Sequence, residues 1–173
     1  MITLRPATPD DLALILHWDE QPHVRDVGGD PDWNDWNWAE ELGRDVPWRE
    51  FLIAMLEDRP IGFVQLIDCR EEESHYWGED CPEHSRAIDI WIGEADCLGK
   101  GYGTQMMRLA IERCFAHPLC NDILIDPMAD NTAAHRFYES LGFKLLGQRF
   151  FGPDDTLVYQ LTRADWRTGD PNA

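Results

Sequence analysis

The sequence predicts an α/β (α+β) fold in which one mixed, mostly antiparallel central sheet carries helices on both faces. Strand-like apolar runs recur along the chain, amphipathic helical runs separate some of them, and short turn-forming segments join the others into hairpins. A length of 173 residues suits one domain with a sizeable core. We expect a single domain over residues 1–166 and a disordered tail over 167–173.

The N-terminal part predicts a strand, a helix and an irregular insert. Residues 2–4 alternate as a short strand. The Thr8–Asp11 segment combines an N-cap, a proline and two acids, which is typical of a helix start. The expected apolar face of that helix consists of Leu12, Ile15, Leu16 and Trp18. Residues 21–48 break the pattern, apart from a possible short helix near Trp38–Gly43. Their tryptophans suit a lid over a site as well as a packed cap; they are Trp33, Trp36, Trp38 and Trp48.

The middle of the chain predicts a hairpin, a polar loop and a central strand. The runs 51–56 and 61–68 are strands joined by the turn 57–60, and the loop covers 69–85. The strand Arg86–Gly93 follows. Alternation places Ile88, Ile90 and Ile92 on one of its faces and Asp89 and Trp91 on the other.

The remaining elements complete the predicted sheet. A helix is expected over residues 105–115, and a short buried strand over Asp122–Asp126. A second helix, capped by Asn131 and ended by Gly142, comes next. The last strands, 144–151 and 156–162, form a hairpin around the turn Gly152–Asp155.

A glycine loop, Leu98–Thr104, lies between the central strand and the helix over 105–115. Its three glycines let backbone N–H groups approach a ligand closely, and the following helix adds the positive end of its dipole. This arrangement suits a pyrophosphate, although such a loop can also be a flexible turn. The spacing Gly99-x-Gly101-x-Gly103 fits neither the dinucleotide fingerprint nor the P-loop.

The order of this loop and the segment Asn131–Phe143 resembles the GNAT superfamily of acetyl-CoA-dependent N-acetyltransferases. The resemblance runs from Ile2 to about Trp166 and implies that acetyl-CoA is the co-substrate. Many members have Gln or Arg where this chain has Leu98, so backbone amides would carry more of the phosphate binding. The resemblance assigns cofactor contacts to Ile90, Trp91, Ile92, Leu98, Gly99, Lys100, Gly101, Tyr102, Gly103, Thr104, Asn131 and Ala134.

Two residues are expected to be catalytic. Asp89 is an acid in an apolar strand, where it is costly unless it is paired, and a cationic amine would supply the pair. It would orient the ammonium and pass its proton through water; the structural alternative is an internal salt bridge to Arg86 or Arg149. The resemblance gives Tyr138 the place of the tyrosine that faces the CoA sulfur, where a phenol can protonate the leaving thiolate.

More specific matches resemble the aminoglycoside 6′-N-acetyltransferase branch. They are Tyr76–Pro82, the strand around Asp89, the glycine loop with its Leu98, Asp126-Pro127, and Pro153-Asp154 before Val158-Tyr159. The resemblance implies an acceptor site lined by Trp77, Glu79, Asp89, Asp126 and Asp154. Alternatives are a siderophore-biosynthesis N-acyltransferase acting on a hydroxylated diamine or lysine, a polyamine or protein acetyltransferase, and a degenerate domain without chemistry.

Charge and cysteines restrict the partners. The net charge of −18 argues against nucleic acid and anionic membranes and attracts a polycationic acceptor. It also repels CoA, so the cofactor site would need loop amides and Lys100, with Arg108 or Arg136 as further candidates. Five cysteines without metal-ligand spacing suit reduced thiols, no metal and a cytoplasmic location. We see no signal peptide or membrane span, and expect a monomer or a homodimer.

Overall fold

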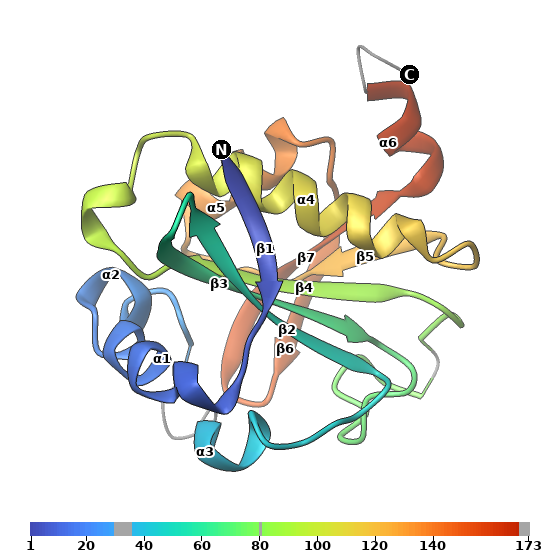
Figure 1. Cartoon of the computed structure of the whole chain (residues 1–173). Coiled ribbons are helices and arrows are strands. Elements are labelled where there is room, and N and C mark those ends of the chain that lie inside the picture. Colours follow the sequence, from blue (N-terminus) through green and yellow to red (C-terminus); the bar gives the residue numbers. More distant parts are fainter. Residues whose placement is uncertain (30–35, 80, 170–173) are drawn as a thin grey trace.

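A seven-stranded sheet organises the computed structural model, which describes residues 1–29, 36–79 and 81–169 (Figure 1). The strands are β1 (Ile2–Pro6), β2 (Arg49–Leu56), β3 (Arg59–Asp68), β4 (Arg86–Ile92), β5 (Asp122–Ile125), β6 (Lys144–Phe151) and β7 (Asp154–Thr162). Their order is β1-β2-β3-β4-β5-β7-β6. The pair β4–β5 is parallel and the other pairs are antiparallel, which confirms the predicted mixed sheet.

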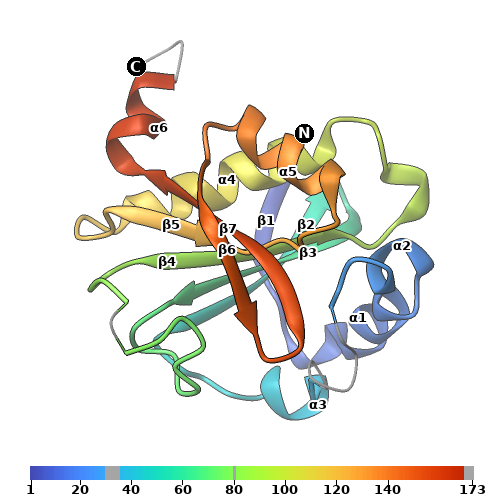
Figure 2. The same cartoon turned by 180° about the vertical axis from the view of Figure 1, so that it is seen from behind.

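Helices cover both faces of the sheet, as predicted. Short 3₁₀ turns precede two of them, at Pro9–Asp11 and Ala95–Cys97. Figures 1 and 2 show α4 and α5 on one side of the sheet, and α1, α2 and α3 at the other side. The helices are α1 (Leu12–Asp19), α2 (Pro22–Arg25), α3 (Trp38–Glu41), α4 (Tyr102–Ala116), α5 (Thr132–Ser140) and α6 (Arg163–Gly169).

Alternation along the strands feeds two apolar layers. Residues such as Val64 and Ile88 pack under Met107 of α4 in the larger layer. Their strand neighbours face the opposite way, so that Phe63 joins Ile15 of α1 in the smaller layer. The smaller layer consists of Ile15, Trp18, Trp38, Ile53 and Phe63.

The helix α1 buries a narrower stripe than predicted. Ile15 and Trp18 are fully buried, but Leu16 is 47% exposed, so its assignment to the apolar face is wrong. The Trp18 ring lies directly against Gly93, the residue after β4. A Cβ atom on Gly93 would lie 2.1 Å from that ring, which leaves no room for a side chain.

The tryptophan-rich insert packs where the structure describes it. Trp38 and Trp48 are buried, Trp36 is 42% exposed, and Trp33 lies outside the described residues. The Trp38 ring meets Phe63 edge-on at 5.2 Å in the layer under α1. Of the two interpretations of these tryptophans, a packed cap therefore describes Trp38.

Two boundaries near the C-terminus differ from the prediction. The last hairpin turns through only two residues, because Gly152 adopts a left-handed φ of 57° and β7 begins at once with Asp154. A helix, α6, also continues to Gly169, three residues into the segment expected as a disordered tail. The rest of that segment, 170–173, lies outside the described residues.

The described residues add three observations on chemistry and location. All five cysteines are buried and free. Within the described ranges, no group of histidine, cysteine and carboxylate side chains could hold a metal ion. In the same part of the chain, none of the helices is long and apolar enough to cross a membrane.

Candidate active site

The strands β4 and β5 separate in the middle of the sheet. They pair only at Arg86↔Ile123 and Ala87↔Leu124, although β4 continues to Ile92. Asp89 stands two residues after Ala87, and Asp126 stands two residues after Leu124. Because side chains alternate along a strand and these strands are parallel, both acids lie at the same level and on the same face. The separation therefore brings two carboxylates together.

Burial makes both carboxylates reluctant to ionise. It raises the pKa of Asp89 to about 6. Burial first, and then the negative charge of Asp89, raise the pKa of Asp126 to about 7. Each acid thus changes protonation close to neutral pH, which is the range in which a side chain can take a proton from an amine and release it again.

The internal salt bridge considered for Asp89 does not form. Arg86 pairs with Asp68 at 3.7 Å instead. Arg149 donates a hydrogen bond from Nη1 to the carbonyl oxygen of Trp77 at 3.0 Å. Among the residues that the structure describes, Asp89 has no ion-pair partner, so its carboxylate is available to a cation from outside.

Tyr76 is a site residue that the sequence analysis missed. Its hydroxyl donates a 2.6 Å hydrogen bond to Oδ2 of Asp126, fifty positions along the chain. Burial, and then the charges of Asp126, Asp89 and Asp154, raise the pKa of this phenol. The matched segment Tyr76–Pro82 pointed to this loop, but the resemblance assigned Trp77 and Glu79 to the acceptor site and not Tyr76.

The other predicted acceptor residues occupy different environments. Asp154 is buried at the start of β7, and its charge reaches Tyr76. Glu79 is exposed on the loop and contributes to none of these pKa shifts. Trp77 is only 6% exposed, and its ring meets Phe151 edge-on at 5.3 Å, as a core aromatic does. The structure therefore gathers Asp89, Asp126 and Asp154, while contacts of Trp77 and Glu79 with an acceptor stay predictions.

Tyr138 of α5 lies within electrostatic range of Asp89 and Asp126. Its ring packs between core aromatics, 5.1 Å from Phe137 and 5.8 Å from Phe143. Burial, and then the charges of Asp89 and Asp126, raise the pKa of its phenol. The hydroxyl therefore remains protonated at neutral pH, as a proton donor requires.

The glycine loop offers uncapped backbone N–H groups. Gly99 and Gly101 adopt left-handed φ values of 69° and 78°, and a Cβ atom at either position would meet nothing within 4 Å. The helix α4 begins at Tyr102, earlier than predicted, and no side chain caps it. Its first N–H groups thus have no partner inside the helix. An anion such as a pyrophosphate would satisfy them, so the residues fit that part of CoA.

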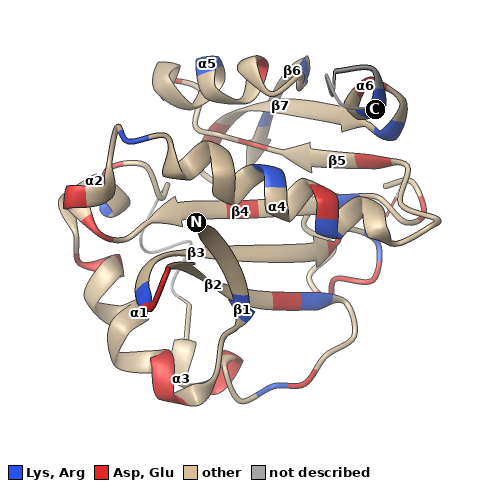
Figure 3. Cartoon of the chain, turned by 45° about the horizontal axis from the view of Figure 1, so that its top comes forward, with Lys and Arg blue, Asp and Glu red and all other residues tan. Residues whose placement is uncertain are grey.

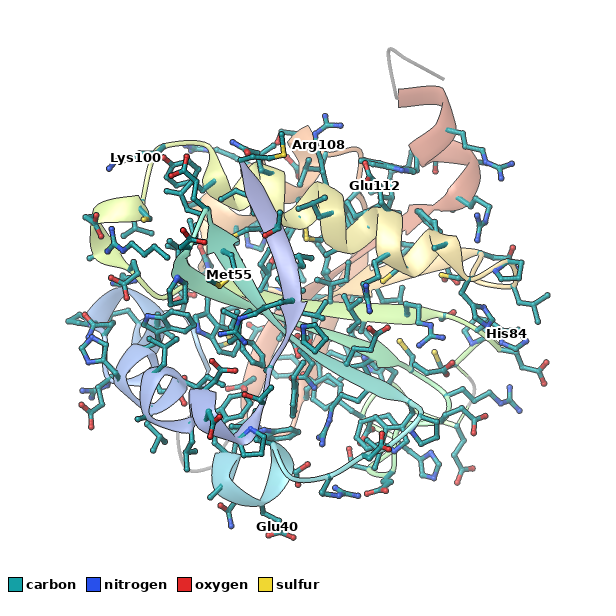
Figure 4. All side chains as sticks on the ribbon, viewed as in Figure 1. Glu40, Met55, His84, Lys100, Arg108 and Glu112 are labelled. Carbon is teal, nitrogen blue, oxygen red and sulfur yellow. The ribbon has the colours of Figure 1, made fainter. Side chains whose placement is uncertain are left out.

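The other predicted cofactor residues surround this loop. Lys100 and Leu98 are exposed, and Figure 4 shows Lys100 at the loop before α4, pointing outward, whereas Arg108 lies along α4. Asn131 caps α5 by accepting a 3.1 Å hydrogen bond from the N–H of Ala134. The remaining members, which are half-buried, are Ile90, Trp91, Ile92, Gly103 and Thr104.

An open hollow of about 530 Å³ lies elsewhere in the molecule. Asp122, Gln160 and Arg163 are among the residues that line it. Asp122 begins β5, whereas Asp126 follows its last residue. The hollow is therefore at the opposite end of this strand from the carboxylates and does not belong to the candidate site.

The comparisons agree with this geometry. A family model described as an acetyltransferase (GNAT) domain matches residues 7–151. The aminoglycoside N(6′)-acetyltransferase type 1 of Klebsiella pneumoniae is 32% identical over 165 residues, which cover 92% of this chain and 82% of that protein. The lysine N-acyltransferase MbtK of Mycobacterium tuberculosis is 26% identical over 149 residues, covering 84% and 70%.

A solved structure extends the likeness to the whole fold. The crystal structure of aminoglycoside acetyltransferase AAC(6′)-Ib with coenzyme A and kanamycin superposes with a TM-score of 0.84 at 28% identity, covering 98% of this chain and 99% of that one. The strand order, the glycine loop and the matched family model lead to one conclusion. The chain belongs to the GNAT family of acetyltransferases, in the branch of the aminoglycoside 6′-N-acetyltransferases.

Proposed function

We propose that this protein transfers the acetyl group of acetyl-CoA to the 6′-amine of aminoglycosides, by direct attack in a ternary complex. The observation that carries the proposal is the pair Asp89 and Asp126, two half-buried carboxylates that lie where β4 and β5 separate. Burial raises both pKa values, and neither acid forms an ion pair with a residue that the structure describes. The relatives named above support the choice of acceptor, because two of them are aminoglycoside acetyltransferases.

The loop residues account for binding of the co-substrate. Acetyl-CoA supplies an activated acetyl thioester. The N–H groups at the start of α4 hold its pyrophosphate, and Lys100 adds a positive charge near them. Asn131 and Ala134 contact the cofactor at the start of α5. The strand segment Ile90–Ile92 lies beside the acyl arm, because β4 extends there without β5 as a neighbour.

The carboxylates and Tyr138 account for the chemistry. Asp89 orients the reacting ammonium and accepts its proton through water, since its raised pKa makes it a stronger base than an ordinary aspartate. Asp126 and Asp154 bind other ammonium groups of the acceptor. Tyr138 keeps its proton until the thiolate of CoA leaves and then donates it.

A lysine side chain is the second candidate acceptor. The likeness to MbtK, a lysine N-acyltransferase, favours it. One carboxylate would suffice for a lysine ammonium, whereas this site gathers three, which better suits a molecule with several ammonium groups. We also place the protein in the cytoplasm, where acetyl-CoA is available and the five free thiols stay reduced.

The test is thiol release from acetyl-CoA by the purified protein. Kanamycin or tobramycin is compared with spermidine and N6-hydroxylysine. An aminoglycoside with a hydroxyl in place of the 6′-amine serves as the matched negative control. We expect thiol release only with the drugs that carry a 6′-amine, and mass spectrometry should place the acetyl group on the 6′-nitrogen. Release with the small amines alone would contradict the proposal and favour the second candidate.

A further inference from the structure

Tyr76 contacts Asp126 although the two residues are fifty positions apart in the sequence. The loop joins β3 to β4 and carries Tyr76 across to the residue after β5. The 2.6 Å hydrogen bond runs from the phenol to Oδ2 of Asp126. A phenol O–H that donates to a carboxylate stabilises the ionised form of the acid. Tyr76 therefore opposes the effect of burial on Asp126.

Two contacts fix the ring and the backbone of Tyr76. The ring stacks on Phe151 of β6, with centroids 4.2 Å apart and planes 5° apart. The guanidinium of Arg149 lies 4.5 Å from the same Phe151 ring. The backbone N–H of Tyr76 donates to Glu72 at 3.0 Å. The phenol is thus aimed at Asp126 before any acceptor binds.

Besides Tyr76, charged groups from two other elements act on the ionisation of Asp126, and two more elements bring groups into the same electrostatic network. Asp89 on β4 disfavours its charged form, and Arg149 on β6 favours it. The charge of Asp154 on β7 reaches Tyr76, and that of Asp126 reaches Tyr138 on α5. The hydrogen bond from Tyr76 is the strongest of the interactions that favour the Asp126 carboxylate, ahead of Arg149.

We infer that Tyr76 is a positioning residue that orients Asp126 and favours its ionised form, so that Asp126 can anchor a cationic group of the acceptor. Asp89 is then left to take the proton from the reacting amine. This inference rests on the proposed function. It assigns different tasks to two carboxylates that the sequence does not distinguish, and it locates the cause of the difference in one hydroxyl group.

The kinetic test uses Tyr76→Phe, which removes the hydroxyl and keeps the ring stacked on Phe151. At pH 7 we expect the KM for kanamycin to rise about tenfold, with kcat reduced less than about threefold, because the lost interaction anchors the acceptor. The KM for acetyl-CoA should not change. The ratio of mutant to wild-type KM should shrink by pH 8.5, where Asp126 ionises without help.

The matched control is Tyr159→Phe. It removes a core hydroxyl that bonds Glu139 at 3.3 Å. Tyr159 pairs with Ile125, so alternation places its side chain on the face of the sheet opposite to that of Asp126. Its KM for kanamycin should equal that of the wild type at every pH. An increase in KM for Tyr76→Phe that is the same at pH 7 and pH 8.5 would overturn the inference, because it would indicate packing rather than ionisation.

Carboxyl ¹³C NMR titration tests the inference without turnover. With Asp126→Asn used to assign the signal, Tyr76→Phe should move the Asp126 midpoint upward by about one pH unit. An unmoved midpoint would overturn the inference, whatever the enzyme acetylates. If the midpoint moves but the wild-type protein acetylates no aminoglycoside, the proposed function fails while the Tyr76–Asp126 pairing stands.

Discussion

At the scale of single residues, the two carboxylates of the site are electrostatically unfavourable for the folded state. Asp89 and Asp126 are half-buried close to each other, and both pKa values lie above that of an ordinary aspartate. An acid whose pKa is raised by folding destabilises the folded state at any pH above its unfolded pKa of about 3.9. This cost is typical of catalytic positions, where function needs a group that the fold alone would not retain.

Asp89→Asn should lower activity and raise stability. Turnover should fall by about 10²–10⁴, because the proton acceptor is lost, while the affinity for CoA stays unchanged. Asp89 is half-buried rather than enclosed, so we expect a gain of roughly 1–2 kcal/mol in unfolding free energy at pH 8. Below about pH 3 the gain should vanish, because Asp89 is then protonated in both the folded and the unfolded state. Thermal melts at the two pH values and calorimetric CoA titration measure these effects; unchanged turnover would contradict the role of Asp89.

The pH dependence of acceptor use should follow the same two acids. We expect kcat/KM for the aminoglycoside to rise with pH between about 6 and 7, as Asp89 and then Asp126 lose their protons. With Asp126→Asn, one ionisation disappears and the acid limb should become less steep. A profile that is flat from pH 5.5 to 8 would be incompatible with these assignments.

At the scale of elements, the glycine loop distinguishes two separate reasons for a glycine: a left-handed backbone conformation and a lack of room for a side chain. Gly101→Ala would force a side chain into a left-handed φ of 78°, at a cost of about 1 kcal/mol, although nothing crowds the position. Gly103 is the matched control, since its φ is not positive and a Cβ atom would be 3.7 Å from Ile92. Chemical denaturation should show a lower free energy of unfolding for Gly101→Ala and an unchanged one for Gly103→Ala. Equal losses would mean that the backbone conformation is not what requires glycine.

The elements were predictable where local pattern determines them. The alternation in β4, the cap of α5 at Asn131 and the order of the elements along the chain follow from period and capping chemistry. The helix α6 and the two-residue turn at Gly152 were missed. In the turn, the choice between strand and loop for Asp154 depends on pairing with Phe151, a tertiary contact that local propensity does not contain.

The candidate site was predictable in part for the same reason. Asp89 stands out as an acid in an apolar strand, but its partner Asp126 becomes its neighbour only once Ala87 is known to pair with Leu124. Tyr76 was missed because its hydrogen bond spans fifty positions. Trp77 is packed in the structure because Tyr76 and Phe151 surround its edge.

At the scale of the whole molecule, the net charge of −18 should influence the two substrates oppositely. Figure 3 shows acidic residues on helices, strands and loops around the chain, with basic ones between them. Such a field attracts a polycation and repels CoA, and salt screens both effects.

Raising the ionic strength from about 20 to 300 mM should therefore lower kcat/KM for the aminoglycoside several-fold, because salt weakens its attraction to the enzyme. The KM for acetyl-CoA should stay constant or decrease. Steady-state kinetics in a sodium chloride series measures both parameters. A parallel decline in kcat/KM for the two substrates would contradict the electrostatic explanation.

The contact between Trp18 and Gly93 also has a consequence for the history of this family. The indole ring fills the space that a Cβ atom would need, and its Nε1 donates a 2.8 Å hydrogen bond to Glu94 beside it. Gly93 therefore cannot accept a side chain while Trp18 keeps its indole ring in this place. Among related sequences, any residue with a side chain at position 93 should therefore be accompanied by a residue smaller than tryptophan at position 18.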